Sequence, residues 1–197
     1  MTHALFGTDG IRGTAGTFPL DVSTVRRVGA ALVKALPDEN AKLLIGRDTR
    51  ESGEWIEREL AYGARLAGST VQSIGIAPTP AVAYLTGSLE FDAGVVISAS
   101  HNPYQDNGIK VFSGAGVKYG GDFEKRIERL VADSSWDVPA GEAPDVPRAE
   151  HLRKYLDHAR TVLPNPLALG PVRLAVDCAN GAMTTVAPAL FRELGFS

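Results

Sequence analysis

Apolar residues recur along this chain at two spacings, and segments of the two kinds alternate. Helical spacing runs through residues 22–36 and 52–67, where apolar side chains return every three or four positions. The short apolar run at 43–45, the segment 71–76 and the segment 93–98, which begins with an apolar run, are typical of strands. Alternation of strands and helices favours a mostly parallel sheet with helices packed on it. The pattern therefore predicts an α/β protein.

Further elements follow the same logic, with one reversal of direction. An Asn-Gly pair at 107–108 is a strong hairpin signal, and it predicts a tight turn before a return strand at 110–112. The sheet is therefore expected to be mixed, mostly parallel and sandwiched by helices. The remaining elements expected are helices at 81–86, 123–131, 149–163 and 184–194 and a strand at 172–176.

The chain divides near residue 148. Residues 134–148 are rich in proline and lack a periodic apolar pattern, which indicates a linker or a surface excursion. We expect one domain at 1–148, and at 149–197 a connecting helix with the first strand–helix unit of a second, similar domain. Such a unit cannot bury its own faces. It either adds to the first sheet or belongs to a truncated domain, and the pattern leaves both readings open.

Composition and charge exclude several classes of protein. A hydrophobic content of 44% and a charged content of 22% are typical of a soluble globular protein rather than a disordered one. The net charge of −3 offers no basic surface to a nucleic acid, and no apolar run approaches the roughly 20 residues of a membrane helix. The N-terminus shows no signal peptide, and the single cysteine, Cys178, cannot form an internal disulfide. A cytoplasmic protein is expected.

The segment that ends the strand at 93–98 carries candidate chemistry. It continues as Ser-Ala-Ser-His-Asn-Pro, so a buried strand delivers the hydroxyl of Ser100 and the imidazole of His101 to a turn stopped by proline. The predicted turn at 107–108 brings Lys110 back towards the same point. Serine is a weak nucleophile that needs a base or a strong local field, and His101 or Lys110 can supply either or balance phosphate charge. The alternative is a turn whose side chains only cap backbone groups.

Neighbouring residues complete this picture. Ser98 offers a competing hydroxyl, but strand alternation places it one step earlier on the same face, nearer the core. Asn102 and Asn107 are expected to fix the loop. The segment 177–181 is expected to shape a turn rather than bind a metal, and Cys178 has no neighbouring ligand that would support a zinc site.

Two other polar loops can serve the same chemistry. Residues 6–13 read Phe-Gly-Thr-Asp-Gly-Ile-Arg-Gly, in which glycines allow close approach of the backbone and Arg12 offers a planar fork for phosphate oxygens. The alternative there is a glycine-rich entry loop with a surface arginine. Residues 46–50 follow a strand and precede a helix, a place where phosphates often bind. We expect Asp48 to pair instead with one of the two flanking arginines and so to order the loop.

Taken together and in order, these segments are far more specific than any one of them. The runs Gly-Thr-Asp-Gly-Ile-Arg-Gly, Gly-Arg-Asp-Thr-Arg and Ser-Ala-Ser-His-Asn-Pro, followed by Asp-Asn-Gly-Ile-Lys, resemble the α-D-phosphohexomutase superfamily, and most of all its bacterial phosphoglucosamine mutase branch. The run at 176–182 resembles the start of that family's second domain. The resemblance covers essentially the whole chain and implies an N-terminal fragment of such an enzyme.

The resemblance implies an isomerase that interconverts glucosamine 6-phosphate and glucosamine 1-phosphate through a phosphoserine and a bisphosphate intermediate, on the route to UDP-N-acetylglucosamine. Ser100 matches the serine that carries the phosphoryl group, and the implied cofactor, Mg²⁺, binds an oxygen of that phosphate. His101, Lys110 and Arg12 match residues beside the phosphoserine, and Lys110 is the expected proton carrier. The substrate or phosphate contacts implied are Thr8, Asp9, Gly10, Arg12 and Asn102.

The departures from the family pattern set the limits of the prediction. The family has four domains and about twice this length. The 197 residues lack its Asp-Gly-Asp-x-Asp-Arg metal loop, its sugar loop Gly-Glu-x-Ser-Gly-His and its phosphate loop Arg-x-Ser-Gly-Thr-Glu-Pro. We therefore expect the other magnesium ligands to lie outside this chain, the chain alone to be inactive, and its unpaired apolar faces to favour self-association. A related phosphomannomutase or phosphoglucomutase, or a non-catalytic binding module with the same fold, are the alternatives.

Overall fold

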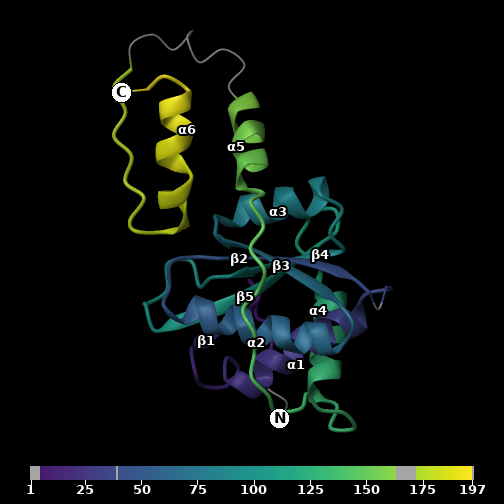
Figure 1. Cartoon of the computed structure of the whole chain (residues 1–197). Coiled ribbons are helices and arrows are strands. Elements are labelled where there is room, and N and C mark those ends of the chain that lie inside the picture. The colour runs from purple at the N-terminus through teal and green to yellow at the C-terminus, as the bar shows by residue number, and fades with distance from the viewer. Residues whose placement is uncertain (1–4, 39, 163–171, 197) are drawn as a thin grey trace.

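The computed structural model describes residues 5–38, 40–162 and 172–196 (Figure 1). Its strands are β1 (Ile11–Thr14), β2 (Lys42–Arg47), β3 (Thr70–Ile76), β4 (Ala93–Ile97) and β5 (Asp106–Ser113). Its helices are α1 (Val22–Ala35), α2 (Ser52–Leu66), α3 (Thr79–Ser88), α4 (Gly121–Ala132), α5 (Leu152–Thr161), the 3-10 turn Ala182–Thr185 and α6 (Ala187–Glu193).

The five strands form one mixed sheet in the order β1-β5-β4-β2-β3. The strands β3, β2 and β4 pair in parallel, whereas β5 runs antiparallel to its two neighbours, β4 and β1. A single strand of this sheet therefore opposes the direction of the rest. The mixed, mostly parallel sheet predicted from the sequence is confirmed.

Helices cover both faces of the sheet, as the alternating apolar runs predicted. Leu43 and Ile45 of β2 pack with α1, α2 and α4 on one face, and Leu44 between them packs with α3 on the other. Figure 1 shows these layers, with α1, α2 and α4 below the sheet and α3 above it. Since successive side chains of a strand point to opposite faces, a strand covered on both sides is apolar throughout.

The turn predicted at Asn107-Gly108 is wrong. Both residues are buried inside β5, and the reversal between β4 and β5 lies earlier, at residues 98–105. Both polar groups of the Asn107 side chain are hydrogen-bonded, because its Nδ2 donates to Ser52 Oγ of α2 at 2.9 Å and its Oδ1 accepts from the Gly108 amide at 2.8 Å. Tertiary contacts therefore override the local hairpin preference of the Asn-Gly pair.

Two further predictions about strands need correction. Residues 11–14, taken from the sequence as part of a loop, form β1 and pair with β5 at the edge of the sheet. Residues 172–176 are extended but form no ladder with any described strand, so the predicted strand is wrong. Nor does this segment add to the first sheet. No strand among the described residues pairs with it, and Val172, Leu174 and Val176 are exposed.

The proline-rich stretch at 134–148 is a surface segment, as predicted. Arg27 of α1 holds its beginning by donating to the carbonyls of Asp133 and Trp136, each at 2.6 Å. Its end pairs with the outer edge of β3, where the Ser73 amide donates to the Pro147 carbonyl at 2.9 Å. The segment thus covers an edge strand and leads the chain back to α5 on the far face of the sheet.

Helix α6 stands beside α5 (Figure 1). Glu193 of α6 pairs with Arg153 at 2.8 Å and with Arg160 at 3.2 Å, which joins α6 to α5. The helix predicted at 149–163 is α5, and position 163 lies outside the described residues. No helix in the described part of the chain is long and apolar enough to cross a membrane.

Candidate functional site

Ser100 lies in the loop that follows β4, at the carboxyl ends of the parallel strands. Its neighbour Ala99 is fully buried, whereas Ser100 itself is exposed. The backbone of Ser100 is left-handed, with φ of 58°, a conformation that costs a non-glycine residue free energy and persists only where the surroundings fix it. Its Oγ lies 3.3 Å from His101 Nδ1. The loop thus presents one free hydroxyl with an imidazole beside it.

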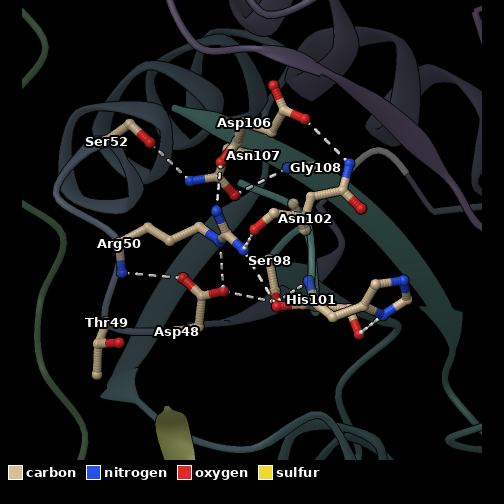
Figure 2. Close-up of polar contacts among 12 residues, drawn as sticks. Asp48, Thr49, Arg50, Ser52, Ser98, His101, Asn102, Asp106, Asn107 and Gly108 are labelled. Carbon is tan, nitrogen blue, oxygen red and sulfur yellow. Dashed lines mark hydrogen bonds and ion pairs between the residues drawn. The ribbon is translucent and has the colours of Figure 1, made fainter. Parts of the chain in front are cut away.

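The competing hydroxyl, Ser98, is already engaged. Its Oγ donates to Asp48 Oδ2 at 2.7 Å and accepts from the Ser100 amide at 3.0 Å (Figure 2). Asp48 follows β2, which lies next to β4, so the two loops meet at the same edge of the sheet. Ser98 therefore orders the loop and leaves Ser100 as the hydroxyl available for chemistry.

Arg50 gathers the loop around its guanidinium (Figure 2). Its Nη1 donates to the carbonyls of Pro103 and Asp106 at 2.6 and 2.9 Å, and its Nη2 to those of Ser100 and Asn102 at 3.1 and 2.8 Å. Its Nε pairs with Asp48 Oδ2 at 3.1 Å. The expected ion pair that orders the loop at 46–50 is therefore present, between Asp48 and Arg50.

Asn102 fixes the loop from the other side, as predicted. Its Nδ2 donates to Asp106 Oδ2 at 3.0 Å, and its Oδ1 accepts from Arg12 Nη1 at 2.8 Å. Arg12 Nη1 also donates to the Ala99 carbonyl at 2.9 Å. The edge strand β1 thereby places a cation directly against the Ser100 loop.

Asp9 links the two cations that the sequence singled out. Its Oδ2 lies 2.6 Å from Arg12 Nη2 and 2.7 Å from Lys110 Nζ. Arg12 contacts the Ser100 loop and Lys110 lies on β5, so the structure brings these predicted residues into one connected group. Asp9 serves here as the partner of the two cations.

We expect Asp9 to titrate in a way that reports this link. Its pKa lies below the ordinary value because Lys110 hydrogen-bonds to the carboxylate, with a smaller effect from Arg12 and with partial burial acting against both. A depressed folded-state pKa adds stability above the unfolded value, about 3.9, and that stability is lost as pH falls through the folded pKa. An NMR titration should place the Asp9 midpoint below that of a free aspartate, and Lys110→Ala should raise it. A midpoint that Lys110→Ala leaves in place would contradict the link.

Thr8 and Gly10 lie on a different hollow from Ser100. Together with Asp9 and Arg12 they line a hollow of about 680 Å³ beside Phe18. The Thr8 carbonyl accepts from Lys118 Nζ at 2.8 Å. Gly10 has φ of 93° and packs against β5, where a Cβ would collide with the Ile109 carbonyl and lie 3.1 Å from Lys110 Cγ. Gly10 thus packs the N-terminal loop against β5, and Thr8 joins it to Lys118, which follows β5 in the chain. Their predicted contact with substrate stays a prediction.

Ser100 opens onto a cleft of about 1040 Å³, close to the upper end of the size range of ligand sites. One wall comes from the loops after β2 and β4 and from the start of α3, and the other from the turn at 178–183. Thr49 Oγ1 donates across the cleft to the Asn180 carbonyl at 2.6 Å. Sequence reasoning assigned the segment 177–181 only the shaping of a turn, and nothing in the spacing of residues indicated that it would face Ser100.

The carboxylates near Ser100 do not form a magnesium site. Asp48 is taken by Ser98 and Arg50, and Asp106 accepts from Asn102 and from Thr14 Oγ1 at 3.1 Å. No group of three or more His, Cys, Asp or Glu side chains suited to a metal occurs in the described part of the chain. Mg²⁺ requires a near-octahedral set of oxygen ligands. The described residues therefore do not fit Mg²⁺ by themselves.

Fold and site together define a three-layer α/β protein with an exposed serine held at the carboxyl edge of its sheet. Residues 3–137 match the family model of phosphoglucomutase/phosphomannomutase, alpha/beta/alpha domain I. This chain belongs to that family. The match includes the loops at 6–13, 46–50 and 98–110 that carry the site.

Curated relatives and solved structures agree with this assignment. The phosphoglucosamine mutases of Polynucleobacter asymbioticus and Dechloromonas aromatica are 46% and 42% identical over 99% of this chain. The chain spans 45% of the length of each. A phosphoglucomutase/phosphomannomutase family protein from Burkholderia thailandensis superposes with a TM-score of 0.75 at 26% identity, over 98% of this chain and 43% of that one. A solved chain from Thermus thermophilus superposes with a TM-score of 0.83 at 24% identity, over 100% of this chain and 45% of that one, and supports the fold.

Proposed function

We propose that this chain carries the phosphoserine loop of a phosphohexomutase and that Ser100 is the residue that holds the phosphoryl group. The observation that carries the proposal is the exposed Ser100 hydroxyl in a loop whose backbone is fixed on both sides. A nucleophile presented on rigid surroundings loses little entropy on the way to the transition state. The proposed substrate is a hexose phosphate bound in the cleft that Ser100 lines.

The chemistry asks little of the protein beyond position and charge. As phosphate leaves phospho-Ser100, the bond between phosphorus and Oγ breaks and a bond to a sugar hydroxyl oxygen forms. Lys110, whose ammonium pairs with Asp9, gives a proton to Ser100 Oγ and takes the proton of the sugar hydroxyl, so its charge is unchanged at the end. Arg12 balances phosphate charge beside the loop. The reverse transfer uses the other phosphate of the bisphosphate and returns the isomer.

Glucosamine 6-phosphate and glucosamine 1-phosphate are the proposed sugars. Two curated relatives, 46% and 42% identical to this chain, are named phosphoglucosamine mutase, which favours this pair over mannose or glucose phosphates. The described residues include no set of side chains that would hold Mg²⁺. If the reaction uses this ion, the phosphate on Ser100 is the only ligand that we assign to this chain. The domain boundary at 148 likewise stays a proposal.

We expect the 197-residue chain alone not to isomerise glucosamine phosphates. It covers 45% of the length of its phosphoglucosamine mutase relatives, and its described carboxylates cannot hold the ion that phosphoryl transfer commonly needs. The measurement is a coupled mutase assay with Mg²⁺ and a bisphosphate activator, with the protein at the full length that the cell makes as the positive control. Appreciable turnover by the 197 residues, lost on Ser100→Ala, would contradict this expectation while supporting the role of Ser100.

A further inference from the structure

Arg50 has no hydrogen-bond donor left for a ligand. A guanidinium has five N–H donors in a fixed fork. In Arg50 the Nε donor goes to Asp48, and the two Nη groups donate to four backbone carbonyls of the loop between 100 and 106. The side chain is 11% exposed. An arginine in this state holds backbone and does not bind phosphate.

Arg12, which touches the same loop, is in a different state. Its Nη1 has two acceptors and its Nη2 has one, Asp9, whereas its Nε is buried without a partner among the described residues. The second N–H of Arg12 Nη2 is therefore left for an additional acceptor. The two arginines beside Ser100 therefore differ in role. Arg50 holds the loop backbone, and Arg12 has a donor left for a ligand.

The contacts of Arg50 reach both peptide groups of Ser100. On the carboxyl side, Nη2 donates to the Ser100 carbonyl at 3.1 Å. On the amino side, the path runs from Arg50 through Asp48 to Ser98 Oγ, which accepts from the Ser100 amide at 3.0 Å (Figure 2). Because φ and ψ of Ser100 are set by these two peptide planes, the network holds Ser100 in the left-handed conformation that it would otherwise leave.

We propose that Arg50 is the positioning residue of the reaction, acting through Asp48 and Ser98 to fix the Ser100 hydroxyl for phosphoryl transfer. The kinetic part of this inference rests on the proposed function. The structural part, that Arg50 orders the loop, rests on the observed contacts alone. Arg50 lowers the barrier to phosphoryl transfer by restricting the conformation of Ser100 rather than by contacting the sugar phosphate. Its loss therefore lowers kcat and leaves KM nearly unchanged.

The test compares Arg50→Ala with Arg58→Ala. Arg58 is a matched control because it lies on α2 and its guanidinium pairs with Asp145 at 3.6 Å, away from the loop. Hydrogen exchange of the 197-residue chain reports the amides of Ser100, Asn102 and Asp106. The kinetics of the protein at the full length that the cell makes are measured with and without guanidinium chloride at non-denaturing concentration. Arg50→Lys serves as a second variant if Arg50→Ala is unstable, because a lysine has one nitrogen and cannot reach all the carbonyls.

For Arg50→Ala we expect exchange at the three loop amides to rise about tenfold, kcat to fall about 100-fold with KM within about threefold, and guanidinium to restore part of kcat. Arg58→Ala should match the wild type in loop-amide exchange, in kcat and KM, and in its lack of response to guanidinium. Unchanged loop exchange, a raised KM with intact kcat, or no rescue by guanidinium would each overturn the proposal. If Ser100→Ala keeps its activity, the proposed function fails, but the exchange arm still decides whether Arg50 orders the loop.

Discussion

Ser100→Ala is expected to reduce hexosamine phosphate isomerisation by about 10⁴-fold or more, in the protein at the full length that the cell makes. The side-chain oxygen is the atom that receives the phosphoryl group in the proposed reaction, and the neighbouring hydroxyl cannot replace it, since Ser98 is bound to Asp48. Alanine keeps the amide that donates to Ser98 Oγ and the carbonyl that accepts from Arg50. The fold should therefore be unchanged, with a thermal midpoint close to the wild type.

Ser98→Ala is the matched control for this prediction. It removes a hydroxyl from the same loop, two residues away, and breaks the link between Asp48 and the Ser100 amide. We expect a partial loss of activity, well short of the loss in Ser100→Ala, and a phosphorylated species that persists. If Ser98→Ala were the variant that abolishes turnover and phosphorylation while Ser100→Ala retained both, the assignment of the nucleophile would be reversed.

Gly10→Ala is expected to destabilise the fold by about 2–4 kcal/mol and to lower activity strongly. Gly10 has φ of 93°, and a Cβ there would collide with the Ile109 carbonyl of β5. The collision forces β1 away from β5, and these two strands carry Arg12 and Lys110. The free energy of unfolding in urea and the mutase rate would both record the change.

Gly16→Ala is the control that separates the cost of backbone strain at positive φ from the cost of the collision between a Cβ and β5. Gly16 has φ of 91°, almost the same as Gly10, but no atom lies within 4 Å of the position of its Cβ. We expect a cost of about 1 kcal/mol from the backbone alone and no loss of activity. Equal effects of the two substitutions would show that conformational strain explains Gly10, and that its contact with β5 is unimportant.

The spacing of apolar residues along the sequence predicted those helices whose burial follows from that spacing. The apolar periods at 22–36 and 52–67 correspond to α1 and α2 to within a residue, because each helix buries one face against the sheet. The Asn107-Gly108 turn failed because burial of Asn107 and its bond to Ser52, from a residue 55 positions away, outweigh the local preference. Strand β1 could not be predicted either, since its pairing depends on β5 across the chain.

The candidate site divides in the same way. Ser100, His101 and Asn102 are adjacent in sequence, so a single motif places them on one loop. The hydrogen-bond acceptors of Arg50 could not be predicted, because they are backbone carbonyls and a sequence does not show which carbonyls a side chain will reach. The far wall of the cleft, at 178–183, depends on how the C-terminal part of the chain packs against the loops after β2 and β4, which the sequence does not show.

The most direct test of the role of Ser100 is to follow labelled phosphate. The protein at the full length that the cell makes is incubated with a hexosamine bisphosphate carrying labelled phosphate. One portion is digested and its phosphorylated peptide is mapped by mass spectrometry. Unlabelled hexosamine phosphate is added to a second, intact portion. We predict one phosphoryl group on the peptide that contains Ser100, and its appearance in the sugar product at the rate of turnover. Normal turnover with no label on Ser100, or a label that never leaves it, would contradict the account.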